Sequence, residues 1–271
     1  MLIPDQTFSL KLLMSFFVGS IWVTSVTVFA ERFGSRIGGF IGGLPSTVVV
    51  ALLFIGLSQS TKDASRAAAM IPMIMGVNGL FILVYLARIK QGLIQAMITA
   101  LLVWFLVVAF IIWTRVDSAL FSFIIWVLTI GGWYYIVEHL MSIPQAGGIR
   151  VPYTMKQIIA RGLFSGVIIS IAVLIARLTG PVVGGIFANF PVIFISTLFI
   201  THQTGGAEFS RSVAKTLMIS AMVNVGVYCF AAYFAYMYLD LVSGTLAAVS
   251  IAVFSGVITY RFFKQQPSIR A

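Results

Sequence analysis

Long apolar stretches separated by short polar segments run along the whole chain. Each stretch has about 20 residues, the length of an α-helix that crosses about 30 Å of lipid hydrocarbon. The stretches are apolar on every helical face, whereas strands of a membrane barrel would be alternating segments of about ten residues. The pattern predicts nine membrane-spanning helices, at 8–30, 37–57, 67–87, 92–113, 119–136, 158–176, 182–200, 217–238 and 242–260.

The composition indicates the same class. Hydrophobic residues make up 60% of the 271 residues, charged residues make up 9%, and the mean hydropathy is +1.07. In soluble domains about half of the residues are apolar and about a quarter are charged. The chain is therefore predicted to be an all-α, polytopic membrane protein, which excludes a soluble domain, a disordered tail and a disulfide scaffold. The single cysteine, Cys229, allows neither an intramolecular disulfide nor a cysteine-rich metal site.

The basic residues are unevenly distributed between the two sides that nine spans would define. The chain has 17 Lys and Arg against 7 Asp and Glu. Five basic residues fall on the side of the N-terminus: Lys11, Lys62, Arg66, Arg115 and Arg177. The other twelve fall on the opposite side. Because cytoplasmic loops are enriched in Lys and Arg, we expect the N-terminus outside and the C-terminus in the cytoplasm. The membrane is expected to be a bacterial-type cytoplasmic membrane. Since the basic residues act as orientation signals, no nucleic acid is expected as a partner.

The second and seventh predicted spans share unusual residues at a fixed spacing. Segment 33–54 aligns without gaps with segment 179–200, at an offset of 146 residues. Glycine pairs, intraspan prolines and midspan asparagines are uncommon on lipid-facing helices, so their recurrence in one frame predicts an internal repeat. The identical pairs are Gly34 and Gly180, Gly38 and Gly184, Gly39 and Gly185, Pro45 and Pro191, Leu52 and Leu198, Ala68 and Ala214, Val77 and Val223, and Asn78 and Asn224.

The offset covers five spans, so each element of the second unit should cross the membrane in the direction opposite to its mate. The sequence thus predicts two inverted-topology repeats, 1–116 with helices 1–4 and 158–271 with helices 6–9. Segment 117–157 would connect them, with the fifth helix and a Pro- and Gly-containing cytoplasmic linker. This is an architecture of many secondary transporters.

Glycine and proline in the repeated motif predict broken helices. Proline lacks an amide donor and clashes with the preceding turn, but it is favoured in the first turn of a helix. A helix restarted at Pro45 or Pro191 would present free amides and a positive dipole end inside the membrane, where an anionic or polar group can bind. The expected substrate-binding residues are Gly42, Gly43, Pro45, Ser46, Thr47, Asn78, Asn189, Pro191 and Asn224. The alternative is that these glycines and prolines only let helices pack closely.

The polar residues within the spans leave some roles open. Asn78 and Asn224 should face the bundle interior, either in interhelical hydrogen bonds or as ligands of a solute or ion. Arg161 is expected to snorkel to the interface, with a cavity-facing side chain as the alternative. No carboxylate lies deep in a span, which argues against an acidic proton relay. A coupling ion such as Na⁺ held by backbone carbonyls remains open.

No motif indicates an enzyme, and the sequence predicts no catalytic residue, metal ligand or cofactor. The two histidines, His139 and His202, lie at the ends of different spans, and the pair Glu138-His139 is expected to be an interfacial anchor. We therefore expect a secondary carrier or exporter for a small polar or anionic solute, working by alternating access around helices 2 and 7. Its other partners would be the lipid bilayer, a coupling ion and further copies of the chain. A lipid or lipid-phosphate translocator and a non-catalytic structural subunit are the alternatives.

Overall fold

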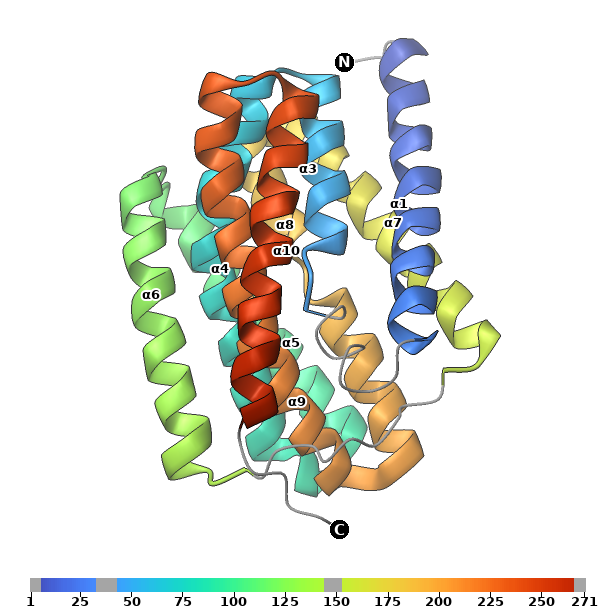
Figure 1. Ribbon diagram of the computed structural model, residues 1–271, viewed down its shortest axis with the longest axis vertical. Helices are drawn as coiled ribbons and strands as arrows, with labels where there is room; N and C mark the ends of the chain where they lie inside the picture. Colours follow the sequence, from blue (N-terminus) through green and yellow to red (C-terminus); the bar gives the residue numbers. More distant parts are fainter. Residues whose placement is uncertain (1–5, 33–42, 144–152, 266–271) are drawn as a thin grey trace.

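The computed structural model describes residues 6–32, 43–143 and 153–265, and these residues form a bundle of helices without a strand (Figure 1). The all-α class is therefore confirmed for the described part of the chain. The helices are α1 (Gln6–Arg32), α3 (Ser46–Ser58), α4 (Thr61–Arg88), α5 (Leu93–Thr114), α6 (Ala119–Tyr135), α7 (Met155–Thr179), α8 (Pro181–Ala188), α9 (Val192–Tyr238) and α10 (Leu241–Gln265). A 3₁₀ turn (Ile89–Gln91) follows α4, and a π-helical turn (Ile136–Leu140) ends α6.

Seven of the helical stretches in the described residues are long and apolar enough to cross a membrane, which marks the chain as an integral membrane protein. The number differs from the expected nine for two reasons. Helix α3, with 13 residues, is too short to cross alone, and part of the expected second span lies outside the described residues. The expected seventh and eighth spans form one continuous stretch of 58 residues, Pro181–Tyr238.

Helix α9 reverses direction at Gly206. This residue has φ 75° and ψ −171°, a backbone conformation that residues with a Cβ rarely adopt. The turn divides α9 into a first arm (192–205) and a second arm (207–238). The first arm runs from the middle of the molecule to its lower end, and the second arm returns to the upper end (Figure 1). Helix α3 leaves the middle in the opposite direction, toward the upper end.

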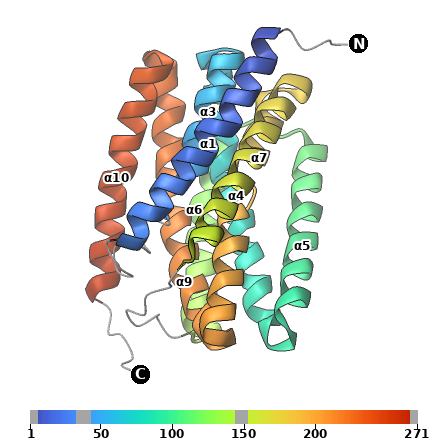
Figure 2. The ribbon, with the colours of Figure 1, turned by 90° about the vertical axis from the view of Figure 1, so that its right-hand side faces the viewer.

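Helix α4 occupies the centre of the bundle. It is buried along almost its whole length, and it packs against α9, α5, α6 and α8. Helices α5 and α6 instead expose most of their apolar side chains, as lipid-facing helices do. Figure 2 shows α1 and α7 side by side, with α10 and α5 at opposite edges. Where α1 and α7 meet, Gly162 lies against Thr24 and Gly166 against Ser20, so small residues permit a close approach of the two helices.

A buried ion pair holds the end of α6 against α9. The ammonium group of Lys215 lies 2.7 Å from Glu138 and donates a hydrogen bond to the carbonyl of Ile143 at 2.6 Å. Lys215 is 3% exposed, so it is a buried residue of α9 rather than part of a polar loop. Glu138 is correspondingly an ion-pair partner and not merely an interfacial anchor.

Replacing Glu138 by Gln is expected to destabilise the protein by about 2 kcal/mol, because the ion pair is lost and the Lys215 ammonium stays buried. The double variant Glu138→Gln with Lys215→Met should recover part of the loss, since the stranded charge is gone. Unfolding of purified protein in mixed detergent micelles measures both. A double variant that loses as much stability as Glu138→Gln, or more, would contradict a coupled pair.

Candidate functional site

Pro45 and Pro191 adopt nearly the same backbone conformation. Their φ angles are both −75°, and their ψ angles are 47° and 37°. After each proline the next amide donates back across it, Ser46 to the carbonyl of Leu44 and Val192 to that of Phe190, both at 2.7 Å. These are tight inverse γ-type turns. Each turn starts a helix at once, α3 at Ser46 and α9 at Val192, where the sequence predicts a restart.

The first turns of α3 and of α9 leave amides free. In α3 the first backbone amide that reaches back to the proline carbonyl is that of Val49, and in α9 it is that of Ile195. Among the described residues no acceptor is found for the amides of Thr47 and Val48 in α3, or of Ile193 and Phe194 in α9. Such unpaired amides lie at the positive end of the helix dipole.

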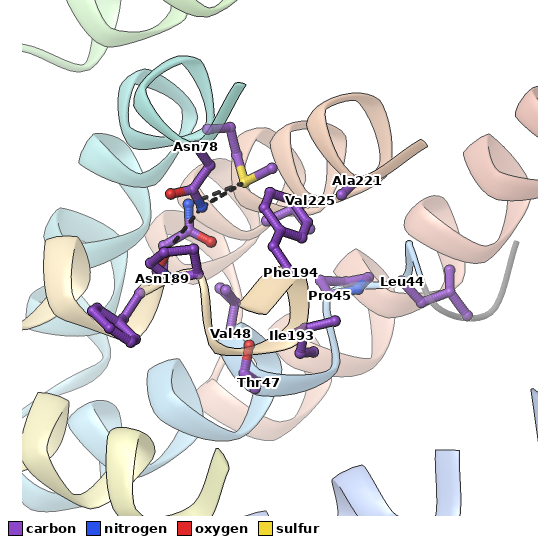
Figure 3. A pocket seen from close by; sticks show the side chains of 13 residues that line it. Leu44, Pro45, Thr47, Val48, Asn78, Asn189, Ile193, Phe194, Ala221 and Val225 are labelled. Atoms are coloured by element: carbon purple, nitrogen blue, oxygen red, sulfur yellow. Dashed lines mark hydrogen bonds between the residues drawn. The ribbon is translucent and has the colours of Figure 1, made fainter. Parts of the chain in front are cut away.

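A small cavity lies between the two helix starts (Figure 3), which are near the middle of the molecule (Figure 1). Its volume is about 30 Å³, enough for about two water molecules. All four residues with free amides line it. The lining residues are Leu44, Pro45, Thr47, Val48, Met75, Asn78, Asn189, Phe190, Pro191, Ile193, Phe194, Ala221 and Val225.

Most of the lining consists of residue pairs at the spacing of the predicted repeat. Ten of the lining residues form five pairs whose numbers differ by 146: Leu44 and Phe190, Pro45 and Pro191, Thr47 and Ile193, Val48 and Phe194, and Met75 and Ala221. The two members of each pair approach the cavity from different segments of the chain. The cavity therefore lies where corresponding positions of the two segments meet.

Asn78 connects three helices beside the cavity. It is buried on α4, accepts a hydrogen bond from the indole nitrogen of Trp104 on α5 at 2.7 Å, and donates to the main-chain carbonyl of Asn189 at 2.9 Å. That carbonyl is an otherwise unpaired group at the end of α8. Figure 3 shows Asn78 and Asn189 next to each other on one side of the cavity, across from Pro45. Asn78 thus closes the end of α8 and uses both atoms of its amide.

The side chain of Asn189 has a free oxygen. Its amide nitrogen points to the sulfur of Met75 at 3.0 Å, and no donor to its Oδ1 is found among the described residues. Asn189 is 6% exposed and lines the cavity. An acceptor without a donor, beside four free amides, gives the cavity the groups needed to bind a polar solute or water.

The expected site residues divide into four groups, of which Asn224 alone forms the last. Pro45, Thr47, Asn78, Asn189 and Pro191 come together around the cavity. Ser46 and Gly43 adjoin it without lining it, and Gly43 packs against Ser220. Gly42 lies outside the described residues, as do Gly34, Gly38 and Gly39.

Asn224 does not line the cavity. It is fully buried on α9, donates to Ser220 at 3.2 Å, and accepts hydrogen bonds from Ser255 at 3.1 Å and Thr259 at 3.2 Å on α10. It thus makes the interhelical hydrogen bonds of the simpler interpretation. Asn78, which precedes Asn224 by 146 positions, makes the corresponding link between α4 and α5 through Trp104.

Arg161 is placed differently from the expectation. It is 7% exposed on α7, so the interpretation of a snorkelling side chain is wrong. One guanidinium nitrogen, Nη1, donates to Thr197 at 3.0 Å and to the hydroxyl of Tyr153 at 3.3 Å, and the group lies 5.7 Å from the centre of the Tyr153 ring. Arg161 therefore faces the first arm of α9.

Comparison with known proteins gives a partial family match. Residues 12–118 match the family Protein of unknown function (DUF3147). The matched region is less than half of the chain and runs from α1 to the connection before α6. No curated protein and no solved structure matches the chain significantly.

Proposed function

We propose that the chain is a multi-pass membrane carrier that moves a small polar or anionic solute by alternating access about the central cavity. The observation that carries the proposal is the meeting of two helix starts, after Pro45 and Pro191, with their free amides at one small cavity. Many secondary transporters hold their substrate between such discontinuous helices near the bilayer midplane.

The helix boundaries support two inverted repeats. Shifting α4 (Thr61–Arg88) by 146 residues gives 207–234, which falls on the second arm of α9, and shifting α3 (Ser46–Ser58) gives 192–204, the first arm. Helices α1 and α7 correspond in the same way, as do α5 and α10, within about three residues at their first positions. We propose that α6 connects the two repeats.

The proposed topology has nine crossings, if the expected second span, of which α3 is the described helix, and α8 with the first arm of α9 each count as one. An odd number agrees with the positions of α1, which begins at the upper end, and α10, which ends at the lower end (Figure 1). The sequence assigns twelve of the 17 basic residues to the side of the C-terminus, which favours a cytoplasmic C-terminus in this topology.

In this mechanism the solute would replace water at the free amides. A cavity of about 30 Å³ is smaller than most solutes, so in this mechanism the described conformation would lie between the two open states. Tilting one repeat against the other would open the cavity first to one side and then to the other, while the prolines fix the helix starts.

Thiol labelling tests whether the cavity is an aqueous pathway. In a protein with Cys229→Ser, single cysteines at Thr47 and Ile193 are expected to react with a membrane-impermeant thiol reagent, because both positions line the cavity. A candidate solute should slow the reaction at both. The wild-type chain is the matched control, because its one cysteine, Cys229, is buried and does not line the cavity, and it should not react.

The outcomes separate the alternatives. Absence of labelling at both positions, in the presence and absence of solutes, would contradict the carrier and favour a structural subunit. Labelling by a lipid-soluble maleimide alone would favour the translocator of lipids or lipid phosphates. Labelling at Thr47 and Ile193 as readily as at exposed control cysteines, without protection by any solute, would indicate a channel.

A further inference from the structure

Arg161 is a buried cation without a carboxylate partner in the described part of the chain. An arginine side chain stays protonated in proteins, so its charge cannot be removed by loss of a proton. Burial of a charge costs several kcal/mol unless it is paired or well hydrogen-bonded. The acidic side chains that the structure describes all have other partners: Asp63 with Ser60, Asp117 with Arg66, Glu138 with Lys215, Glu208 with Arg211, and Asp240 with the first amides of α10.

The free side of the guanidinium is the side that binds oxyanions. Both hydrogen bonds that Arg161 donates to described residues come from Nη1. Its Nε is buried and unpaired. The hydrogen bonds of Arg161 to described residues do not involve Nη2. Nε and Nη2 form a planar pair of parallel donors, which matches two oxygens of a carboxylate or phosphate. Thr197 and Tyr153 thus hold the guanidinium and leave this pair of donors open.

A second unpaired donor lies on the same helix. Ser165 is fully buried, and its hydroxyl has no partner. It follows Arg161 by four residues, so both side chains lie on one face of α7. A buried hydroxyl and a buried guanidinium without acceptors on one helix face point to a missing ligand that accepts hydrogen bonds.

The position of Arg161 relates it to the central cavity. Thr197 follows Ile193 by one helical turn, a rise of about 6 Å, so it lies on the face of α9 that reaches the cavity. The free amides at the starts of α3 and α9 add a positive potential there. At the spacing of the repeat, the position corresponding to Arg161 is Ser15, and the position corresponding to Thr197 is Ala51. The cation therefore occurs in one half only.

We infer that Arg161 and Thr197, with Ser165, form a binding site for a small oxyanion of the carboxylate or phosphate type, one turn of α9 from the cavity. The inference rests on the proposed function and narrows its solute to an anion. Arg161 lies toward the N-terminal end of α7. In the proposed topology this end is on the cytoplasmic side. A solute that leaves the free amides toward the cytoplasm would therefore meet the guanidinium.

Anion-dependent stability of the purified full chain tests the site. Thermal unfolding, followed by tryptophan fluorescence, is measured against acetate, inorganic phosphate and sulfate, with chloride at equal ionic strength as reference. At least one oxyanion is expected to raise the midpoint in a saturable way. Arg161→Gln should weaken that response about tenfold or more, since a charge-assisted hydrogen bond is worth about 1.5–3 kcal/mol. Arg161→Lys should weaken it less, because the charge remains and the paired donors do not.

Two control variants keep the test decisive. Arg177→Gln changes an exposed arginine of the same helix and should leave the oxyanion response unchanged. Thr197→Val removes one hydrogen bond that positions Arg161 and gives a second variant if Arg161→Gln fails to fold. Equal responses in wild type, Arg161→Lys and Thr197→Val would overturn the site.

Further outcomes separate this inference from the proposed function. Protection of the cysteines at Thr47 and Ile193 by a neutral solute, without an oxyanion response, would support the carrier and overturn the anion site. The side chain of Glu31 lies outside the described residues, so Glu31→Gln is made in parallel. A response that emerges only in Glu31→Gln would show that a carboxylate already occupies the guanidinium, and would likewise overturn the site.

Discussion

Replacing Asn78 by Leu is expected to lower the free energy of unfolding by about 2–5 kcal/mol. The substitution keeps the size of the side chain but leaves the Trp104 indole and the Asn189 carbonyl without their partner. Each buried polar group left unpaired costs about 1–3 kcal/mol. Detergent-mediated unfolding of the purified protein, followed by helical circular dichroism, measures the change.

The matched control for this prediction is Asn224→Leu. The partners of Asn224 are hydroxyl groups, and Thr259 already donates to the carbonyl of Ser255 on its own helix at 3.0 Å. Hydroxyls can return to such bonds, so the expected loss is about 1 kcal/mol, in the range of interhelical hydrogen bonds in membranes. Equal losses for the two asparagines would refute the special role of Asn78 in closing the end of α8.

Replacing Gly185 by Val is expected to cost about 3–5 kcal/mol, because α8 meets the backbone of α4 at this residue. A Cβ at Gly185 would come against the carbonyl oxygen of Ala67 and within 2.9 Å of its Cα. Backbone atoms cannot move aside as a flexible side chain can, so α8 would be displaced from α4. The reaction of a cysteine at Ile193 should change with it, since α8 ends at the cavity.

Gly131→Val is the control for that substitution. Gly131 lies on α6, and apart from its chain neighbours and the backbone of its own helix no described atom is within 4 Å of the position that a Cβ would take. Its replacement should change stability by less than about 0.5 kcal/mol, as is usual for surface positions. A loss at Gly131 equal to that at Gly185 would mean that valine itself, and not the contact with Ala67, is responsible.

The local features of this protein were predictable from the sequence, because they depend on composition and on proline. The long apolar stretches predict helices and a membrane location, and Pro45 and Pro191 predict the starts of α3 and α9. The recurrence of residues at an offset of 146 predicts which two segments face each other at the cavity. In each of these cases the informative residues lie within one segment of the sequence, or in two segments that can be aligned with each other.

Long-range contacts could not be predicted in this way. Asn78 and Asn189 are 111 positions apart, and nothing in either sequence environment indicates that one side chain closes the helix of the other. The burial of Arg161 depends on where α7 crosses α9, so a residue near a span end was expected at the interface. Gly206 turns the chain within a single residue, where the sequence predicts a polar loop between two spans.

The burial of α4 has a consequence for how such a chain must be assembled. Much of the surface that covers α4 belongs to the second arm of α9, and the cavity needs residues from both halves. A polypeptide that ended after α5, the extent of the family match, would leave this apolar face uncovered and hold half a cavity. Under the proposed topology, only a second copy inserted in the opposite orientation would complete it. In that proposed topology, carrying both orientations in one polypeptide would fix their ratio at one to one and make their pairing independent of concentration.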